Sequence, residues 1–200
     1  MDQRGASVDG GEGMAEYVVL LDDHGQVSGH QDKATVHNES TPLHLAFSCH
    51  VFDRHGQVLL TRRALTKTTW PGAWTNSVCG HPGPGEPMED AVRRRARFEL
   101  GIELADVTTM LPGFRYRAVD AGGMVENEIC PVFRATAVGS VRANRDEVSE
   151  WQWARPADVA RAVTSAPFVF SPWFVAQVAA GIYSAHLPAA ALGGPRDDPW

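Results

Sequence analysis

The chain has 200 residues, of which 44% are apolar and 21% charged, an ordinary composition for one globular domain with or without extensions. Its net charge of −6 at neutral pH is opposite to that of general binders of nucleic acids or anionic membranes, so an anionic ligand needs a local group of cations or a metal. Three cysteines, Cys49, Cys79 and Cys130, lack CxxC spacing, which argues against a disulfide framework and favours a reducing compartment.

The amino-terminal segment is polar and glycine-rich, without the basic and then apolar pattern of a secretory signal. The most apolar stretch, 167–183, contains serine, proline and glutamine and is shorter than a membrane span. We therefore expect a cytoplasmic protein with no membrane or nucleic-acid partner, present as a monomer or a weak homodimer.

Strands and helices alternate between two polar tails. We expect a disordered extension over 1–14, a single domain over 15–187 and a flexible tail over 188–200. Alternating apolar residues and turn signals predict strands over 16–21, 44–52, 57–62, 114–119, 124–135 and 149–154. Apolar periodicity predicts helices over 87–100, 156–163 and 171–185. Because the strands form hairpins rather than repeated βαβ units, the fold class is α+β, a mixed α/β sandwich.

The predicted helix 87–100 carries an apolar stripe in which residues recur every four positions, at Met88, Val92, Ala96 and Leu100. Glu99 lies seven residues after Val92 and therefore shares that face. A carboxylate beside an apolar stripe is costly unless it is paired or bound to a metal. On the helix alone we favour a salt bridge to a nearby arginine.

The segment around this helix follows the spacing of a Nudix box, a loop–helix–loop that binds a divalent metal and a diphosphate. The matching positions are Gly80, Glu86, Arg94, Ala96, Glu99, Gly101 and Ile102. Arg95 and Phe98 occupy two positions where that pattern has metal-binding glutamates, which counts against ordinary Nudix diphosphate hydrolysis.

Two glutamates stand two residues apart in the predicted strand MVENEICPVF. Glu126 and Glu128 therefore project from the same side, with Asn127 opposite. Like charges this close require a cation to stay ionised together. The apolar neighbours argue against a solvated edge, so we favour a metal site.

Three of the eight histidines become candidate metal ligands in combination with these glutamates, although a lone histidine is more often a surface or core residue. His37 and His44 flank a proline near the start of a strand, and His81 follows Cys79 by two residues. Three imidazoles and two carboxylates form a nitrogen and oxygen ligand set that suits Mn²⁺, Mg²⁺ or Zn²⁺.

Cys79 lies in the sequence TNSVCGHP, among residues typical of a tight loop, whereas Cys49 sits in an apolar strand and reads as core. A loop cysteine can act as a nucleophile or as a general acid and base. A nucleophile needs a histidine base, and His81 is the neighbouring candidate. If His81 binds a metal it cannot serve as that base, so we favour proton transfer.

Cations for an anionic ligand follow the strand 57–62, in the sequence TRRALTKTTWPG. Arg62, Arg63 and Lys67 precede an aromatic loop, a position that fits the rim of a cleft. Tryptophans are abundant here, and one that faces the site could stabilise a positive charge with its π face by roughly 0.5–2 kcal/mol.

These motifs together resemble type I isopentenyl diphosphate isomerases of the Nudix superfamily. The resemblance rests on TNSVCGHP, the helix ending in RFELG, FRYRA, VENEICPVF and FSPW, and it covers about Glu16 to Gln177. TNSVCGHP combined with ENE is far more specific than either motif alone. The resemblance implies a Nudix-like fold with a mixed sheet flanked by helices. It also implies a metal-dependent, flavin-independent isomerase that interconverts isopentenyl and dimethylallyl diphosphates through a tertiary carbocation for isoprenoid biosynthesis.

The resemblance also implies roles for individual residues. It implies proton transfer by Cys79 and Glu128, with Tyr116 beside them and Trp173 over the hydrocarbon end. The implied basic residues near the phosphates are Lys33, Arg63 and Lys67. The implied ligands of one metal are His37, His44, His81, Glu126 and Glu128. Glu99 is implied to help hold a second ion, Mg²⁺, on the diphosphate.

Two other functions fit parts of the sequence. A Nudix-type diphosphate hydrolase fits the spacing from Gly80 to Ile102, but the residues at Arg95 and Phe98 count against it. A non-enzymatic, metal-stabilised binding module would keep the fold without the activity. The complete set of Cys79, Glu126 and Glu128 makes it the least favoured of the three.

Overall fold

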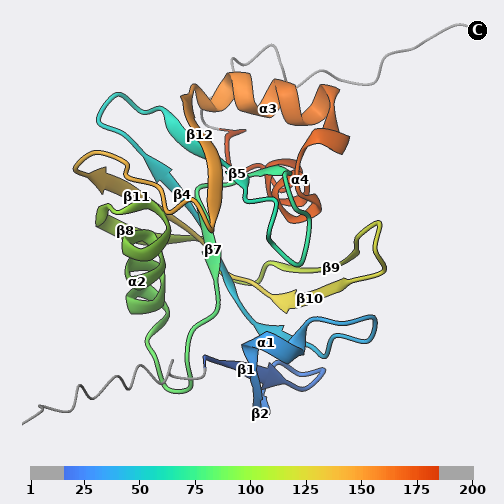
Figure 1. Ribbon diagram of the computed structural model, residues 1–200. Coiled ribbons are helices and arrows are strands. Elements are labelled where there is room, and N and C mark those ends of the chain that lie inside the picture. The colour runs from blue at the N-terminus through green and yellow to red at the C-terminus, as the bar shows by residue number, and fades with distance from the viewer. Residues whose placement is uncertain (1–15, 185–200) are drawn as a thin grey trace, which may run out of the picture.

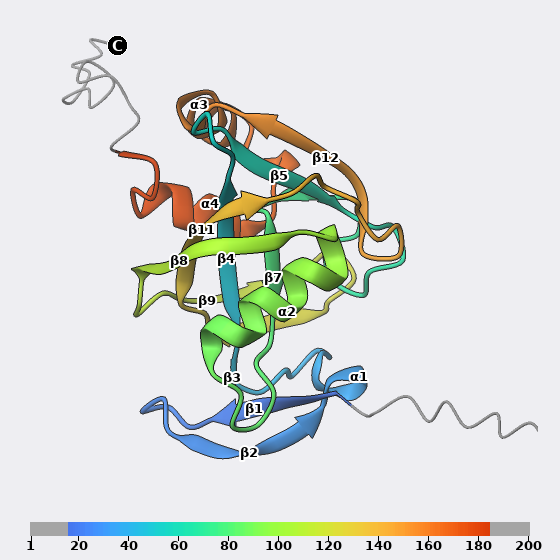
Figure 2. The ribbon, with the colours of Figure 1, turned by 90° about the vertical axis from the view of Figure 1, so that its left-hand side faces the viewer.

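The computed structural model describes residues 16–184, and both predicted tails, 1–14 and 188–200, lie outside these residues. The described chain has the predicted α+β architecture, with two sheets and helices packed around them (Figures 1 and 2). Within 16–184, no helix is both long enough and apolar enough to cross a membrane.

Two mixed sheets form the framework. The smaller sheet, ordered β2-β1-β3-β10-β9, contains β1 (Tyr17–Leu21), β2 (Val27–Asp32), β3 (His44–Leu45), β9 (Arg115–Val119) and β10 (Val125–Ile129). The larger sheet, ordered β12-β5-β4-β11-β8, contains β4 (Phe47–Phe52), β5 (Val58–Arg63), β8 (Glu103–Leu111), β11 (Val132–Val138) and β12 (Val148–Ala154). Two short strands, β6 (Trp74–Thr75) and β7 (Val78–Gly80), pair with β5 and β4.

The helices cover the sheets and carry parts of the site. They are α1 (Lys33–Val36), α2 (Met88–Leu100), α3 (Pro156–Ser165) and α4 (Pro172–Ala179), with a 3₁₀ turn at Pro167–Val169. The predicted helices 87–100 and 156–163 are confirmed as α2 and α3. The predicted helix 171–185 is too long, because the chain leaves the helix after Ala179 and turns at Gly181, whose φ is +86°.

Two of the predicted strands each divide between the sheets. The segment 44–52 becomes β3 and β4, separated at Ala46, and the segment 124–135 becomes β10 and β11, separated at Cys130 and Pro131. These crossings run side by side, because β3 pairs with β10 and β4 with β11, both in parallel. The predicted hairpins are confirmed where β4 meets β5 and where β9 meets β10. Residues shortly before and after the crossings therefore lie close together.

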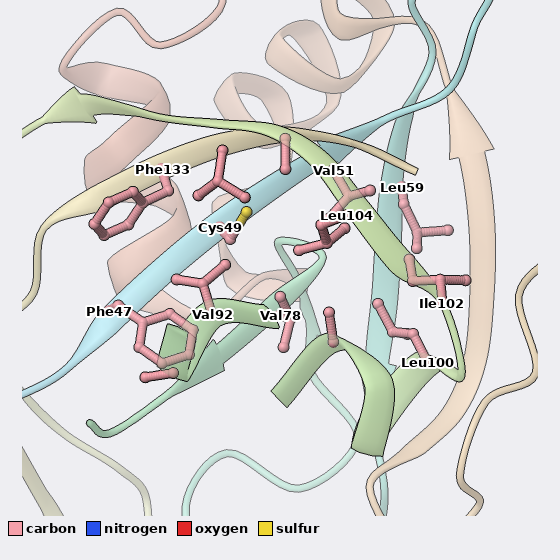
Figure 3. Close-up of a cluster of buried hydrophobic side chains, with 14 of the residues drawn as sticks. Phe47, Cys49, Val51, Leu59, Val78, Val92, Leu100, Ile102, Leu104 and Phe133 are labelled. Atoms are coloured by element: carbon pink, nitrogen blue, oxygen red, sulfur yellow. The ribbon is translucent and has the colours of Figure 1, made fainter. Parts of the chain in front are cut away.

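The largest apolar core lies between α2 and the larger sheet, as Figure 3 shows. Val92 and Leu100 on α2 are fully buried against Cys49 and Leu59 on β4 and β5. This confirms the apolar stripe predicted for the helix and places Cys49 in the core. Strands β2 and β8 were not predicted, since neither has a sustained apolar alternation.

The carboxyl end of α2 is fixed by a glycine and by the loop that follows β11. Gly101 adopts the left-handed conformation, with φ of +63°, and its amide donates to the Arg97 carbonyl at 3.0 Å. The amide of Asn144 donates to the Glu99 carbonyl at 2.8 Å. The end of the helix, and with it Glu99, is thus held in a defined position.

Substitution of Gly101 by alanine tests this arrangement. A β-carbon there would lie 2.9 Å from the Arg142 carbonyl oxygen, whereas at Gly56, with φ of +76°, it would meet no atom within 4 Å. Gly56→Ala should lower the free energy of unfolding by about 1–2 kcal/mol through backbone strain alone. Gly101→Ala should lower the free energy of unfolding by roughly 1–3 kcal/mol more than Gly56→Ala, because its β-carbon also crowds the Arg142 backbone. Urea denaturation of both variants measures this difference, and equal losses would contradict it.

Candidate active site and metal centre

A cavity of about 240 Å³ lies where the two sheets and α2 and α4 approach one another. Its wall contains most of the predicted site residues, which are Lys33, His37, Arg63, Lys67, Cys79, His81, Glu99, Tyr116, Glu126, Glu128 and Trp173. His44 is fully buried behind this wall and contacts His81 and Glu128. The structure therefore brings the whole predicted set together.

Local structure explains how the histidines and Glu128 converge. His44 on β3 is the register partner of Glu128 on β10, so the two side chains stand side by side. His37 ends α1, whose first turn is capped by the Asp32 carboxylate accepting from the Ala34 amide at 2.8 Å. His81 follows β7 directly.

A backbone hydrogen bond to Nδ1 orients the imidazole of His44. Nδ1–H donates to the Pro42 carbonyl at 2.9 Å, which directs Nε2 toward His81 and Glu128. That Nε2 is 3.2 Å from His81 Nε2 and 3.4 Å from Glu128 Oε1, and His81 Nε2 is 3.2 Å from the same oxygen. Two ring nitrogens and one carboxylate oxygen thus face a common point.

This arrangement fits a divalent metal. One ligand atom from each of His37, His44, His81 and Glu128 lies within 4.8 Å of the others. Among the described residues, three buried polar atoms here form no hydrogen bond, namely Nε2 of His37, Nδ1 of His81 and Oε2 of Glu126, although the His37 and Glu126 atoms lie 3.1 Å apart as an ion pair. Unpartnered buried nitrogen and oxygen atoms are costly, and a metal ion would satisfy those that face it. Imidazole and carboxylate are suitable ligands for such an ion.

The charges of the group agree with a cation site. Burial lowers the pKa of His81 to about 4, so that imidazole is neutral near pH 7. Burial opposes the charged form of Glu128, but hydrogen bonds from His44 and His81 outweigh it and hold the carboxyl pKa well below its usual range. Glu128 is therefore a buried carboxylate, a group that requires a compensating charge.

Glu126 lies beside these four residues. Its Oε1 accepts from the Thr69 hydroxyl at 2.7 Å, and its Oε2 is 3.1 Å from His37 Nε2. Glu126 is thus positioned next to the metal ligands, through His37, while its role as a ligand stays a prediction.

Cys79 lies on β7 opposite Ser48 of β4. Its sulfur is 3.2 Å from Asn76 Oδ1 and 3.4 Å from Ser48 Oγ. Burial raises the pKa of Cys79 to about 11, so the group is a thiol near neutral pH. Within 16–184 no hydrogen bond joins Cys79 to His81, which agrees with a proton-transfer group rather than a base-activated nucleophile.

Aromatic side chains line the same part of the cavity. Tyr116 is the register partner of Glu128 across β9 and β10. The Trp173 ring lies 5.7 Å from the Tyr116 ring and 5.4 Å from the Trp70 ring, between centroids. The guanidinium of Arg63 lies 5.3 Å from the Trp173 ring centroid, so this π face already attracts a cation.

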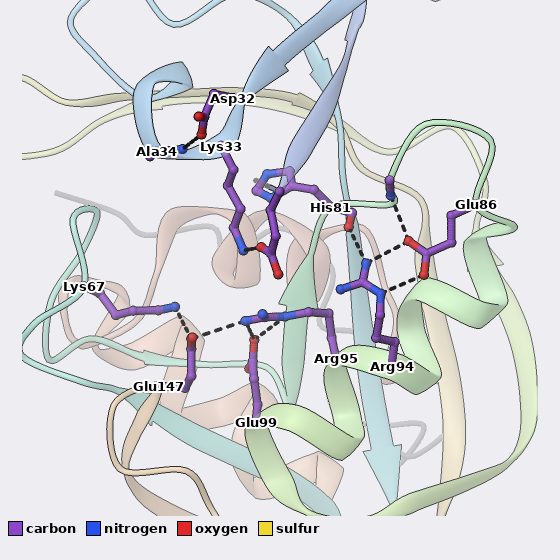
Figure 4. A network of polar contacts seen from close by, with 12 residues as sticks. Asp32, Lys33, Ala34, Lys67, His81, Glu86, Arg94, Arg95, Glu99 and Glu147 are labelled. Carbon is purple, nitrogen blue, oxygen red and sulfur yellow. Dashed lines mark hydrogen bonds and ion pairs between the residues drawn. The ribbon is translucent and has the colours of Figure 1, made fainter. Parts of the chain in front are cut away.

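Basic and acidic residues alternate at the other end of the cavity, as Figure 4 shows. Arg95 forms ion pairs with Glu99 and Glu147, and Lys67 pairs with Glu147. Burial raises the pKa of Glu99, although the neighbouring Arg95 opposes the shift. The salt bridge predicted for Glu99 is confirmed, and the same carboxylate also faces the cavity.

Two residues of this end were missed in the sequence. Arg95 was noted only as a departure from the hydrolase pattern, although it lies four residues before Glu99 and hence on the same helical face. Glu147 comes from the loop before β12, and no local pattern marks it.

Arg94 holds the loop between β7 and α2. Its guanidinium donates to both carboxylate oxygens of Glu86, each at 2.7 Å, and to the His81 carbonyl at 3.1 Å (Figure 4). The Nudix-box positions Glu86 and Arg94 therefore fix the backbone of His81, a predicted metal ligand.

The comparisons with known proteins agree with this site. The family model of the NUDIX domain matches residues 42–174. A protein of Clavibacter michiganensis subsp. michiganensis named isopentenyl-diphosphate Delta-isomerase is 59% identical over 163 residues, 82% of this chain and 84% of that protein. A protein of the same name from Salmonella arizonae is 53% identical over 162 residues, 81% of this chain and 89% of that protein.

Solved structures support the fold alone, since their sequences are distant. A crystal structure from Deinococcus radiodurans has a TM-score of 0.64 at 19% identity, covering 84% of this chain and 99% of that chain. A MutT protein from Methanosarcina mazei has a TM-score of 0.55 at 18% identity, covering 70% of this chain and 92% of that chain.

Metal binding gives a direct test of the histidine and glutamate group. His44→Gln should weaken the affinity for Co²⁺ at least about tenfold, because loss of even an outer-shell partner typically costs 10–100-fold. Isothermal titration and the visible spectrum of bound Co²⁺ measure the effect. His30→Gln, on exposed β2, is the matched control and should bind like the unmodified protein. Unchanged binding by His44→Gln would contradict the site.

Proposed function

The chain belongs to the isopentenyl-diphosphate Delta-isomerase family of NUDIX-domain proteins, and from this premise we propose that it interconverts isopentenyl and dimethylallyl diphosphates in the cavity described above. The observation that carries the proposal is that Cys79 and Glu128 line one small cavity whose wall also contains the cations Lys33, Arg63 and Lys67. The product would supply isoprenoid biosynthesis.

The reaction needs two proton-transfer groups around one alkene. An unactivated alkene is a poor base, so a positioned acid must protonate its terminal carbon and create a tertiary carbocation. A second group then removes a proton from the methylene that joins the cationic carbon to the diphosphate-bearing carbon, which forms the new double bond. We assign these steps to Cys79 and Glu128, whose roles exchange when the reaction runs in reverse. The neutral thiol of Cys79 and the ionised Glu128 supply one proton and one acceptor at the start of a turnover.

The carbocation must be stabilised by groups that do not form a covalent bond with it. Trp173 is 2% exposed and offers a π face, which attracts positive charge and is a weak nucleophile. Tyr116 lies beside Glu128 in register and is suited to orient or relay its proton. The buried aromatic wall also excludes water, which would convert the cation to an alcohol.

The diphosphate would bind at the charged end. Lys33, Arg63 and Lys67 line the cavity there and offer cations to the phosphate oxygens. Glu99 would hold Mg²⁺ on the diphosphate in this proposal. Anchoring the charged end aligns the short hydrocarbon with the two proton-transfer groups.

The metal at the histidine and glutamate site would be Mn²⁺, Mg²⁺ or Zn²⁺, held by His37, His44, His81, Glu126 and Glu128. When bound, such an ion supplies positive charge that keeps Glu128 ionised and fixes its orientation. The convergence of ligand atoms from His37, His44, His81 and Glu128 within 4.8 Å of one another, with Glu126 Oε2 beside His37 Nε2, supports this ligand set.

The hydrolase alternative is not favoured. Arg95 and Phe98 take the places of two metal-binding glutamates of the hydrolase pattern, so α2 lacks two of its carboxylates. Phe98 is about half exposed and offers no ligand. We further propose that the isomerase acts in the cytoplasm as a monomer or a weak homodimer.

Two substitutions test the proton-transfer pair. Cys79→Ala and Glu128→Gln should each lower the turnover of isopentenyl diphosphate by at least about 10³-fold, because each removes a group that exchanges a proton with the substrate. The assay is incubation in D₂O with Mg²⁺, with the product and its label position read by NMR and mass spectrometry. The unmodified protein should form dimethylallyl diphosphate that carries deuterium.

Cys49→Ala is the matched control, since it removes a buried thiol from the core and not from the cavity. It should keep near-normal turnover. Near-normal turnover by Cys79→Ala or Glu128→Gln would contradict the assignment, and phosphate release without any change in the alkene would favour the hydrolase.

A further inference from the structure

One face of α4 carries two buried side chains with polar atoms one turn apart. Trp173 and Gln177 are separated by four residues, so they point to the same side of the helix. Gln177 is fully buried and does not line the cavity. An amide removed from water in this way must have its hydrogen bonds satisfied inside the protein.

The contacts of Gln177 define the direction of each hydrogen bond. His50 Nε2 lies 2.9 Å from Gln177 Oε1, which only accepts, so His50 carries its proton on Nε2. Burial lowers the pKa of His50 to about 4, and the neutral ring then accepts from the Tyr183 hydroxyl on Nδ1 at 2.7 Å. The remaining amide donor, Gln177 Nε2, donates to Ser48 Oγ at 2.9 Å.

This series of hydrogen bonds leaves the proton of the Ser48 hydroxyl available for donation. Ser48 Oγ accepts from Gln177, so its own proton is available for a sulfur, and Cys79 Sγ lies 3.4 Å away. The sulfur of Cys130 lies at 3.5 Å on the same oxygen. Ser48 is fully buried and has no access to the cavity wall.

The other partner of Cys79 is also fixed from α4. Asn76 Oδ1 accepts from Trp173 Nε1 at 3.1 Å and from the Thr75 hydroxyl at 3.0 Å. Its amide nitrogen donates to the carbonyls of Cys49 and Val78, so the orientation of the side chain is locked. The same oxygen accepts from the Cys79 thiol at 3.2 Å, so the locked amide offers the S–H proton an acceptor in a fixed position.

We propose that Gln177 is a positioning residue for the isomerase reaction, acting through Ser48 to orient the Cys79 thiol. Ser48 donates to the sulfur at 3.4 Å and the Cys79 thiol donates to Asn76 Oδ1 at 3.2 Å, so the sulfur is held from two sides in one orientation at the cavity wall. Helix α4 thus places the cation-stabilising ring of Trp173 and directs the thiol from the same face. This inference rests on the proposed role of Cys79.

The experiment compares Gln177→Met, Ser48→Ala and the double variant with the unmodified protein. Gln177→Met keeps the length of the side chain and removes its hydrogen bonds. Each single variant should lower kcat about tenfold, as expected for one lost hydrogen bond, and leave KM within about twofold. The kcat of the double variant should lie within about twofold of the kcat of Ser48→Ala, because both substitutions interrupt the same series of hydrogen bonds.

A spectroscopic readout separates orientation from general damage. The infrared S–H stretching band of Cys79, taken as the difference between each protein and its Cys79→Ala partner, should shift in Gln177→Met and Ser48→Ala. The matched control is Phe174→Leu, a fully buried residue of α4 that contacts the His50 ring without a polar contact to the site. It should lower stability but keep kcat and the S–H band.

Three results would overturn the inference: normal kcat in Gln177→Met, additive losses of about 100-fold in the double variant, or an equal kcat loss in Phe174→Leu. If Gln177→Met does not fold, Ser48→Ala decides alone, with an unchanged kcat and S–H band as the contrary result. An unmodified protein without isomerase activity, or an active Cys79→Ala, would instead overturn the proposed function.

Discussion

Burial of the Glu128 carboxylate is the constraint on which the site depends. The carboxylate is only 5% exposed, and its described partners are the imidazoles of His44 and His81. Burial keeps His81 neutral, whereas at His44 burial is outweighed by the hydrogen bond to Glu128, which raises the pKa of that imidazole, so at most one of these rings offers a positive charge. In the proposed site a divalent ion among the four converging side chains would add the remaining positive charge and leave Glu128 ionised beside a neutral thiol. A neutral acid and an ionised base in one cavity are what the proposed isomerisation requires.

The fold meets this constraint through the two adjacent crossings between the sheets. The crossings at Ala46 and at Cys130 and Pro131 bring His44 beside Glu128, and place Ser48 opposite Cys79. Of the candidate metal ligands, His44 and Glu128 come from the smaller sheet and His37 from the end of α1, while His81 follows β7 of the larger sheet, the strand that also carries the thiol of Cys79. Trp173 of helix α4 forms part of the cavity wall.

The sequence allowed much of this site to be predicted, because short spacings encode which side chains share a face. The two-residue spacing of Glu126 and Glu128 and the motif around Cys79 led directly to the cavity. The sheet crossings could not be predicted, since an unbroken apolar run such as 44–52 reads as one strand. The roles of Glu147 and Gln177 also escaped prediction, because each depends on partners distant in sequence.

The most direct measurement of the central claim is a crystal structure with Mn²⁺ and a saturated, unreactive analogue of isopentenyl diphosphate. Anomalous scattering would locate the ion. The account predicts an ion on His44, His81 and Glu128, with the hydrocarbon of the analogue held between Cys79 Sγ and the Glu128 carboxylate. An analogue whose hydrocarbon contacts neither group, or an ion bound away from Glu128, would contradict it.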